Sequence, residues 1–275
     1  MILLFGAGGQ LGRELVRSGT ARTLPMVALA HGEADIADPE AVGRAISRHR
    51  PSLVVNAAAY TKVDAAEVET EAARLGNETG PAVLAAAAAA AAGVPLIHIS
   101  TDYVFDGSKE SAYGEDDPIA PINAYGRSKA AGESAVRGTA SKHVILRTSW
   151  VYGEFGQNFL KTMLALAATR DELRVVSDQR GCPTSTTDLA DAILAIAPRL
   201  AANEDVWGTY HYAGSGVTSW HGFASRIVAA QAPLTGREPR VTPILARDYP
   251  TAARRPANSV LDCSKFVRPE RQAIM

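Results

Sequence analysis

The sequence predicts an α/β fold built on a doubly wound parallel sheet, with a smaller C-terminal lobe. Short apolar runs rich in β-branched residues alternate with helical patterns through the first half of the chain, which is typical of βαβ units. A glycine-rich turn also joins the first of these runs to the first helical pattern. The length of 275 residues suits one large domain, or one domain that carries a smaller lobe.

The first half of the chain supplies candidate strands and the helices between them. Asp38 is a suitable N-cap, because Pro39 follows it at the first helical position. The run of eight alanines from Ala85 is too short and too weakly apolar to cross a bilayer, so it predicts a closely packed helix. The expected strands are residues 2–5, 25–29, 53–55, 96–99 and 143–146, and the expected helices are residues 10–18, 39–49, 82–92 and 125–136.

After Trp150 the pattern is less regular. We expect helices at residues 159–168, 187–197 and 220–230, and short strands at residues 174–176 and 210–212. Gly and Pro are frequent in residues 233–256. We therefore expect most of the sheet in residues 1–150, and the last sheet elements interleaved with a small lobe in residues 151–275. Such a lobe would cover the carboxyl ends of the strands, where open α/β sheets bind ligands.

Composition and charge exclude several classes of protein. The formal net charge of −1 provides no basic field to collect nucleic acid, so a phosphate ligand needs a local site. Cys182 and Cys263 form no CxxC pair, which fits a reduced compartment, and the histidines show no paired metal-ligand spacing. The N-terminus lacks the features of a signal peptide. We expect a cytoplasmic protein without a nucleic-acid or membrane partner.

A phosphate-binding turn is predicted where the first strand meets the first helix. The segment Gly6-Ala-Gly-Gly9-Gln-Leu-Gly12 lets the backbone turn sharply and approach a pyrophosphate, which the free N–H groups of the helix then bind. At the end of the second strand, Ala30 stands where an acid normally binds the adenosine ribose. Without a carboxylate at that position nothing repels a 2′-phosphate, which favours NADPH over NADH.

A tyrosine and a lysine spaced four apart form the predicted catalytic pair. In Tyr125-Gly-Arg-Ser-Lys129 the two side chains share one face of a helix. A nearby ammonium stabilises the phenolate and moves the pKa of Tyr125 down toward the working range, so that the tyrosine can give a proton to a carbonyl that accepts hydride. Ser100-Thr101-Asp102-Tyr103 follows the fourth strand directly, and a hydroxyl there can bond the same carbonyl oxygen.

These motifs resemble the dTDP-4-dehydrorhamnose reductases, a family of extended short-chain dehydrogenases with a Rossmann-like fold. The resemblance runs from residue 1 to about residue 265. Besides the motifs above, it rests on Asn56-Ala-Ala-Ala-Tyr-Thr-Lys-Val-Asp64, Arg147-Thr-Ser-Trp-Val-Tyr152, Asp178-Gln-Arg-Gly-Cys-Pro-Thr184, Gly208-Thr-Tyr-His-Tyr-Ala-Gly214 and Arg255-Pro-Ala-Asn-Ser259.

The resemblance implies an oxidoreductase that uses NAD(P)H to reduce the 4-keto group of dTDP-4-dehydro-6-deoxy-L-mannose, giving dTDP-L-rhamnose. Residues 1–150 would then mainly form the dinucleotide-binding domain, and the lobe would bind the nucleotide sugar. The implied catalytic residues are Thr101, Tyr125 and Lys129. The implied cofactor-binding residues are Gly6, Gly9, Gln10, Leu11, Gly12, Asp35, Ile36, Ala57, Ala58, Ala59, Tyr60, Thr61, Tyr125 and Lys129, and the implied substrate-binding residues are Thr101, Asp102, Tyr103 and Trp150.

The sequence departs from the family in places. Some members bind Mg²⁺ between subunits through carboxylates. Glu14 stays as a candidate ligand, but Thr187-Asp188 stands where a pair of acids is expected, which argues against a metal-bridged dimer and leaves a homodimer of another kind open. The segment from Phe266 to Met275 does not resemble the usual final helix.

Rival functions also fit the fold. A nucleotide-sugar 4,6-dehydratase would need an Asp-Glu pair after the threonine, whereas this chain has Asp102-Tyr103. A ketoreductase for another nucleotide deoxysugar would carry the same catalytic set. A non-catalytic regulatory subunit of the methionine adenosyltransferase type would not need Thr101, Tyr125 and Lys129 intact.

Overall fold

A parallel sheet forms the centre of the computed structural model, which describes residues 1–204 and 206–267. Within these residues the central sheet has six strands in the order β10-β5-β4-β3-β1-β2, all paired in parallel. Their carboxyl ends therefore meet at one edge. The strands are β1 Ile2–Phe5, β2 Met26–Leu29, β3 Leu53–Asn56, β4 Leu96–Thr101, β5 His143–Thr148 and β10 Gly208–His211.

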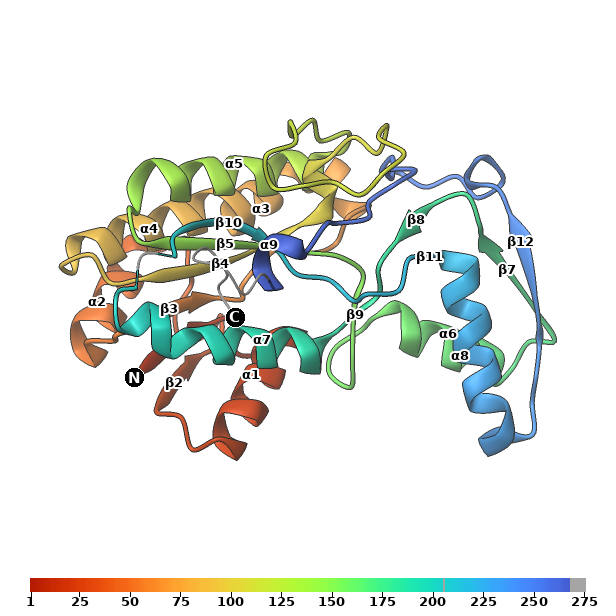
Figure 1. Cartoon of the computed structure of the whole chain (residues 1–275), viewed down its shortest axis with the longest axis horizontal. Helices are drawn as coiled ribbons and strands as arrows, with labels where there is room; N and C mark the ends of the chain where they lie inside the picture. Colours follow the sequence, from red (N-terminus) through yellow and green to blue (C-terminus); the bar gives the residue numbers. More distant parts are fainter. Residues whose placement is uncertain (205, 268–275) are drawn as a thin grey trace.

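Helices cover both faces of this sheet, as the doubly wound prediction requires (Figure 1). Helices α1 Gln10–Ala21 and α7 Thr186–Ala201 pack on one face, where Leu15 and Ile193 meet Leu4 and Val144. The other face carries α2 Pro39–His49, α4 Gly80–Ala90 and α5 Ala124–Thr139. The expected strands and helices of the first half are confirmed, with ends that differ by a few residues. Asp38 caps α2 by accepting from the backbone N–H groups of Glu40 and Ala41.

A smaller unit lies at one end of the sheet in Figure 1. Strands β7 Glu172–Val176 and β12 Arg240–Ile244 pair in parallel, and α6 Phe159–Ala167 and α8 Trp220–Thr235 pack on them around a separate apolar cluster. Short strand pairs join this unit to the sheet: β6 Val151–Tyr152 with β9 Thr184–Ser185, and β8 Arg180–Gly181 with β11 Thr218–Ser219. The remaining helices are α3 Thr70–Arg74, a π-helical turn at Leu75–Thr79, the short 3-10 turns Ala65–Glu67, Asp102–Val104 and Ala246–Asp248, and α9 Ser264–Val267.

Two helices continue through prolines, although proline ordinarily ends a helix. Helix α7 continues through Pro198, because the fully buried Leu200 beyond it adds to the apolar cluster under the sheet. Helix α8 continues through Pro233, and the Thr235 hydroxyl donates to the backbone oxygen of Gln231 in its last turn. Strand β12 was not predicted, since its residues lie in the segment rich in Gly and Pro.

No helix among the described residues is long and apolar enough to cross a membrane. Cys182 and Cys263 are both free thiols. The expectation about the divergent C-terminus falls mostly on residues 268–275, which lie outside the described residues.

Candidate active site

The glycine turn opens the amino end of α1 toward a cavity. Gly6 has a φ of +86°, and a Cβ on it would lie 2.4 Å from the backbone nitrogen of Ala58. A Cβ on Gly12 would lie 2.1 Å from the carbonyl oxygen of Gly6. Both positions therefore need glycine so that strand, turn and helix can approach closely. Gly9 caps α1 with extended backbone and no side-chain hydrogen bond, so the first N–H groups of the helix are available to an anion.

The cavity at the carboxyl edge of the sheet has a volume of about 860 Å³. Among the predicted catalytic, cofactor-binding and substrate-binding residues, only Gly12 does not line it, because Gly12 packs behind the turn against Gly6. The predicted residues that line the cavity are Gly6, Gly9, Gln10, Leu11, Asp35, Ile36, Ala57, Ala58, Ala59, Tyr60, Thr61, Thr101, Asp102, Tyr103, Tyr125, Lys129 and Trp150. The lining residues that were not predicted are Gly8, His31, Ala37, Val63, Ala72, Leu75, Gly76, Ile99, Ser100, Thr148, Val151, Gln157, Leu189 and Trp220.

A buried asparagine holds the wall that follows β3. Asn77 lies in the π-helical turn between α3 and α4 and is fully buried. Its side chain accepts from the backbone N–H of Tyr60 at 2.9 Å and donates to the carbonyl of Tyr60 and the hydroxyl of Ser128. The π turn thus links the segment after β3 to α5. Single π turns inside helices are frequent at functional sites, but nothing local in this sequence indicated one.

Helix α5 carries the predicted catalytic pair. Asn123 caps the helix by accepting from the backbone N–H of Gly126 at 2.7 Å, which places Tyr125 in the first turn and Lys129 one turn later. Thr101 at the end of β4 lies close enough to Tyr125 to lower its pKa. The Lys129 ammonium donates to the carbonyl oxygen of Ile99 at 2.6 Å. Elements far apart in sequence therefore bring the three predicted catalytic side chains into one cavity.

Burial dominates the proton affinities of this pair. It raises the pKa of Tyr125 to about 12, and the nearby Thr101 only partly opposes this rise. It lowers the pKa of Lys129 to about 8, while the charge of Glu133 acts in the opposite direction. The expected lowering of the Tyr125 pKa by Lys129 was therefore wrong for this structure, because desolvation outweighs it and the ammonium is bonded to Ile99. A tyrosine with this pKa holds its proton at neutral pH, as a donor must.

Two stacked indoles join the small unit to the cavity. The rings of Trp150 and Trp220 are 3.5 Å apart at an angle of 5°. Trp150 follows β5 with a φ of +49°, which is uncommon for a residue with a side chain. Trp220 is the first residue of α8 and was not predicted as a site residue. Its place depends on the packing of α8, so no local pattern could have indicated it.

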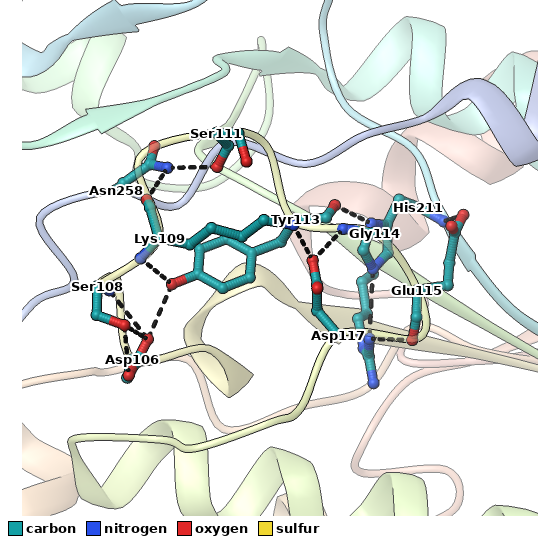
Figure 2. A network of polar contacts seen from close by, with 11 residues as sticks. Asp106, Ser108, Lys109, Ser111, Tyr113, Gly114, Glu115, Asp117, His211 and Asn258 are labelled. Carbon is teal, nitrogen blue, oxygen red and sulfur yellow. Dashed lines mark hydrogen bonds and ion pairs between the residues drawn. The ribbon is translucent and has the colours of Figure 1, made fainter.

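A polar network fixes the loop that leaves the carboxyl edge of the sheet (Figure 2). The Tyr113 hydroxyl donates to Asp106 at 2.8 Å, and the backbone N–H of His211 in β10 donates to Glu115 at 3.0 Å. Asn258 donates to the carbonyl oxygens of Lys109 and Ser111. The loop after Tyr103 is thus tied to the sheet and to the C-terminal segment. These contacts keep the preceding Ser100-Thr101-Asp102-Tyr103 segment in a defined position.

A carboxylate also lies near the end of β2. The backbone N–H of Ala30 donates to the Glu33 carboxylate at 2.8 Å. The expectation of NADPH rested on the absence of an acid at Ala30, but the chain places one beside it from three residues further on. Glu33 therefore supplies a carboxylate beside the position that Ala30 leaves without one.

The residues around Glu14 do not fit a metal ion. Both carboxylate oxygens of Glu14 accept from the Arg17 guanidinium at 2.7 Å, and Arg17 also pairs with Glu154. An internal cation thus already neutralises this buried acid. In the part of the chain that the structure describes, no group of three His, Cys, Asp or Glu residues could hold a metal.

Comparisons with known proteins agree with this architecture. The family model described as the RmlD substrate binding domain matches residues 1–273. A dTDP-4-dehydrorhamnose reductase of Burkholderia thailandensis is 48% identical over 94% of this chain and 89% of its own length. The enzyme of that name from Sinorhizobium fredii is 46% identical over 96% and 89%. The crystal structure of a dTDP-4-dehydrorhamnose reductase from Bacillus anthracis in complex with NADP superposes with a TM-score of 0.89 at 36% identity, covering 96% of this chain and 91% of that one.

Proposed function

The chain belongs to the family of the RmlD substrate binding domain, and from this premise we propose that it catalyses the NAD(P)H-dependent reduction of dTDP-4-dehydro-6-deoxy-L-mannose to dTDP-L-rhamnose. One observation carries the proposal. The Thr101, Tyr125 and Lys129 side chains line the same cavity as the glycine turn, so a proton donor faces the space that the turn opens to a dinucleotide.

The glycine turn fits a dinucleotide. The space beside Gly6 and Gly9 leaves room for a pyrophosphate next to the free N–H groups of α1. A bound nicotinamide would supply the hydride. Asp35 and Ile36 would contact the adenine, and the residues from Ala57 to Thr61 would follow the cofactor past β3.

Tyr125 would give its proton to the carbonyl oxygen of the substrate as hydride reaches the carbon. Thr101 would hold the same oxygen by a hydrogen bond and fix its distance from Tyr125. Lys129 would act through its positive charge, which stabilises the phenolate that Tyr125 becomes. Asp102, Tyr103 and Trp150 would bind the sugar, with the lobe after residue 150 closing over it.

We also propose that NADPH is preferred over NADH, with NADH still used. The NADP found with the Bacillus anthracis relative supports the preference, whereas the Glu33 carboxylate beside Ala30 limits it. The ratio of kcat/KM for the two cofactors measures this preference directly. A ratio that favours NADH would contradict it.

Purified protein, NADPH and the keto sugar nucleotide test the main proposal. Oxidation of NADPH, followed by absorbance, and a product with the configuration of L-rhamnose at C4 are the expected results. Absence of oxidation by correctly folded protein would overturn the reductase function. A product with another configuration at C4 would identify a ketoreductase for a different deoxysugar.

A further inference from the structure

The backbone of Trp150 has a conformation that a residue with a side chain seldom adopts. Its φ of +49° lies in the left-handed region. The residue also lines the cavity, beyond the carboxyl end of β5. Such conformations cost energy and persist only where surrounding contacts hold them, and they are frequent at ligand-binding sites. The neighbours that hold Trp150 are therefore candidates for a role in binding.

The segment after β8 holds the backbone around Trp150. The Ser149 hydroxyl donates to the carbonyl oxygen of Cys182 at 2.7 Å. The backbone N–H of Thr184 donates to the carbonyl oxygen of Trp150 at 3.2 Å. These two bonds fix the chain but leave the indole free to choose among its side-chain rotamers. The orientation of the ring must come from other contacts.

Gly181 in β8 lies against one face of the Trp150 indole. A Cβ on this glycine would lie 2.4 Å from Cε2, 2.6 Å from Nε1 and 2.7 Å from Cζ2 of Trp150. Cε2 is bonded to both of the other atoms and is the nearest of the three, so the glycine approaches the face of the ring rather than its edge. Any larger residue at this position would have to displace the indole.

The ring of Trp220 covers the opposite face. The two ring centroids are 3.5 Å apart and the planes differ by 5°, so no atom fits between the rings. The three atoms nearest to a Cβ on Gly181 all belong to Trp150, which places the glycine on the side of the indole away from Trp220. Trp150 is therefore held in a slot, formed by Gly181 on one side and Trp220 on the other.

The two sides of this slot belong to the small unit and its short strands. Strand β8 pairs with β11 in antiparallel register, with Gly181 opposite Thr218. Trp220 follows β11 directly and is the first residue of α8. Behind it, the ring of Phe159 from α6 lies 4.7 Å away at an angle of 48°. Strand pairing and packing on α6 therefore fix the two sides of the slot relative to each other.

We propose that Gly181 and Trp220 are positioning residues for the nucleotide sugar, because they hold the Trp150 indole where the sugar binds. The proposal rests on the reductase function proposed above, which gives Trp150 its place in the sugar site. Gly181 and Trp220 would act through Trp150 rather than through contacts of their own with the sugar. The small unit would thereby set the affinity for the substrate, while the catalytic side chains on β4 and α5 carry out the chemistry.

The slot can be tested without substrate. Protein labelled with ¹⁵N-tryptophan gives one indole N–H signal each for its three tryptophans, Trp150, Trp207 and Trp220. A ring stacked on an indole shifts its N–H signal, so Trp220→Leu should move the signal of Trp150. Trp207 packs against the apolar cluster under the sheet and serves as the internal control. A Trp150 signal that moves no more than that of Trp207 would overturn the slot.

The affinity for the product sugar nucleotide tests the positioning role. Trp220→Leu should raise the Kd of dTDP-L-rhamnose, measured by calorimetry with NADP⁺ bound, about threefold to tenfold, because it removes an aromatic stack. Trp220→Phe keeps a ring on Trp150 and should recover most of this loss. The Kd of NADPH should stay close to wild type, because the glycine turn is untouched. In turnover, Trp220→Leu should raise KM for the keto sugar nucleotide more than it lowers kcat. An unchanged Kd for dTDP-L-rhamnose would overturn the positioning role.

A double-mutant cycle shows whether Trp220 acts through Trp150. In protein that already carries Trp150→Ala, Trp220→Leu should cause little further loss of affinity for dTDP-L-rhamnose, since no indole is left to hold. An equal loss in the two backgrounds would show that Trp220 contacts the sugar by itself, and would overturn its role as a positioning residue.

Gly181 gives an independent test from the other side of the slot. Gly181→Ala should raise the Kd of dTDP-L-rhamnose about fivefold or more, because its Cβ would displace the indole. The exposed Gly216, whose Cβ would meet nothing within 4 Å, provides the matched control, and Gly216→Ala should bind as wild type does. Wild-type affinity in a correctly folded Gly181→Ala would contradict the role of Gly181.

These experiments also keep this proposal apart from the reductase function. If wild-type protein neither reduces the keto sugar nucleotide nor binds dTDP-L-rhamnose, the reductase function fails, and the positioning role fails with it because there is no sugar to position. If wild type is active and Trp220→Leu binds dTDP-L-rhamnose as wild type does, only the positioning role fails.

Discussion

Helix α5 buries ionisable side chains at two places one turn apart, and the two places differ in how their charges are compensated. At the cavity, Lys129 is only 2% exposed and has a carbonyl oxygen as its hydrogen-bond partner, so burial lowers its pKa to about 8. One turn later Glu133 is fully buried between Arg147 and Arg137, with Arg147 at 2.7 Å. Burial opposes the charge of Glu133, but the hydrogen bonds and charge of Arg147 outweigh it and keep its pKa below the ordinary value.

Compensation by a partner of opposite charge, rather than burial, therefore decides whether a buried side chain stays ionised. A paired carboxylate stays ionised, and its environment is stable over a wide pH range. A buried group without an ion-pair partner has a pKa near neutrality and can take part in proton chemistry. The cavity end of α5 should therefore limit stability and support turnover, whereas the end that carries Glu133 should support stability.

The largest expected effect is on turnover at the cavity end. Tyr125→Phe should lower kcat about a thousandfold, within a range of about 100-fold to 10,000-fold, because it removes the proton and little contact area. Binding of NADPH, measured by fluorescence titration, should change little. The exposed Tyr249→Phe is the matched control. Turnover of Tyr125→Phe close to wild type would show that another group donates the proton.

A loss of stability of similar size is expected at the end of α5 where Glu133 pairs with Arg147. Arg147→Met should lower the free energy of unfolding by about 3–5 kcal/mol, because it leaves the Glu133 carboxylate buried without its closest cation. Urea unfolding measures this loss. The double variant with Glu133→Leu should recover most of it, since no buried charge is then left unpaired. A double variant no more stable than Arg147→Met alone would contradict the pairing argument.

Removing the charge of Lys129 should raise stability, whereas removing the charge of Arg147 should lower it. Lys129→Met should raise the free energy of unfolding near pH 7 by an amount on the order of 3 kcal/mol, since burial lowers the lysine pKa from 10.5 to about 8. Between pH values equal to these two pKa values, the unfolded chain binds more protons than the folded chain. The stability of wild type therefore rises with pH in this range, and its difference from the stability of Lys129→Met disappears. The exposed Lys161→Met should show no such pH dependence. A gap that stays constant from about pH 7 to about pH 10 would refute the assigned cause.

The smallest effect should come from an exposed charge. Glu33→Gln should raise the ratio of kcat/KM for NADPH to that for NADH about twofold to fivefold, because solvent screens the carboxylate beside Ala30. Stability should be unchanged. A ratio that does not move would show that Glu33 does not face the ribose.

Much of the site could be predicted because its signals are local. The four-residue spacing of Tyr125 and Lys129 needs only a helix to place both on one face. The glycine turn could be predicted because Gly6 and Gly12 allow close backbone contacts that a Cβ would block. The position of Thr101 at the carboxyl edge could be predicted because it follows a strand that the sequence pattern indicates. Each of these predictions depended on residues close together in the chain.

Other features could not be predicted because they depend on partners far away in sequence. Trp220 reaches the cavity only because α8 packs against the small unit and its ring stacks on Trp150. Glu133 had a signal, the repeat of four from Tyr125 through Lys129, but its role depends on Arg147 in β5. The expected fall in the pKa of Tyr125 was wrong because the degree of burial follows from the whole fold.

The order of strands and helices, the glycine turn and the pairing of Tyr125 with Lys129 on one helix face could be read from the sequence, because backbone geometry and side-chain spacing are local properties. The tertiary structure alone decided which buried groups are paired. It joined Glu133 to Arg147 and Glu14 to Arg17, and among the described residues it gave Lys129 and Asp102 no ion-pair partner in the cavity. Desolvation and ion pairing depend on everything within a few ångströms, whatever its distance along the chain, and so proton affinities emerge only when the chain is folded.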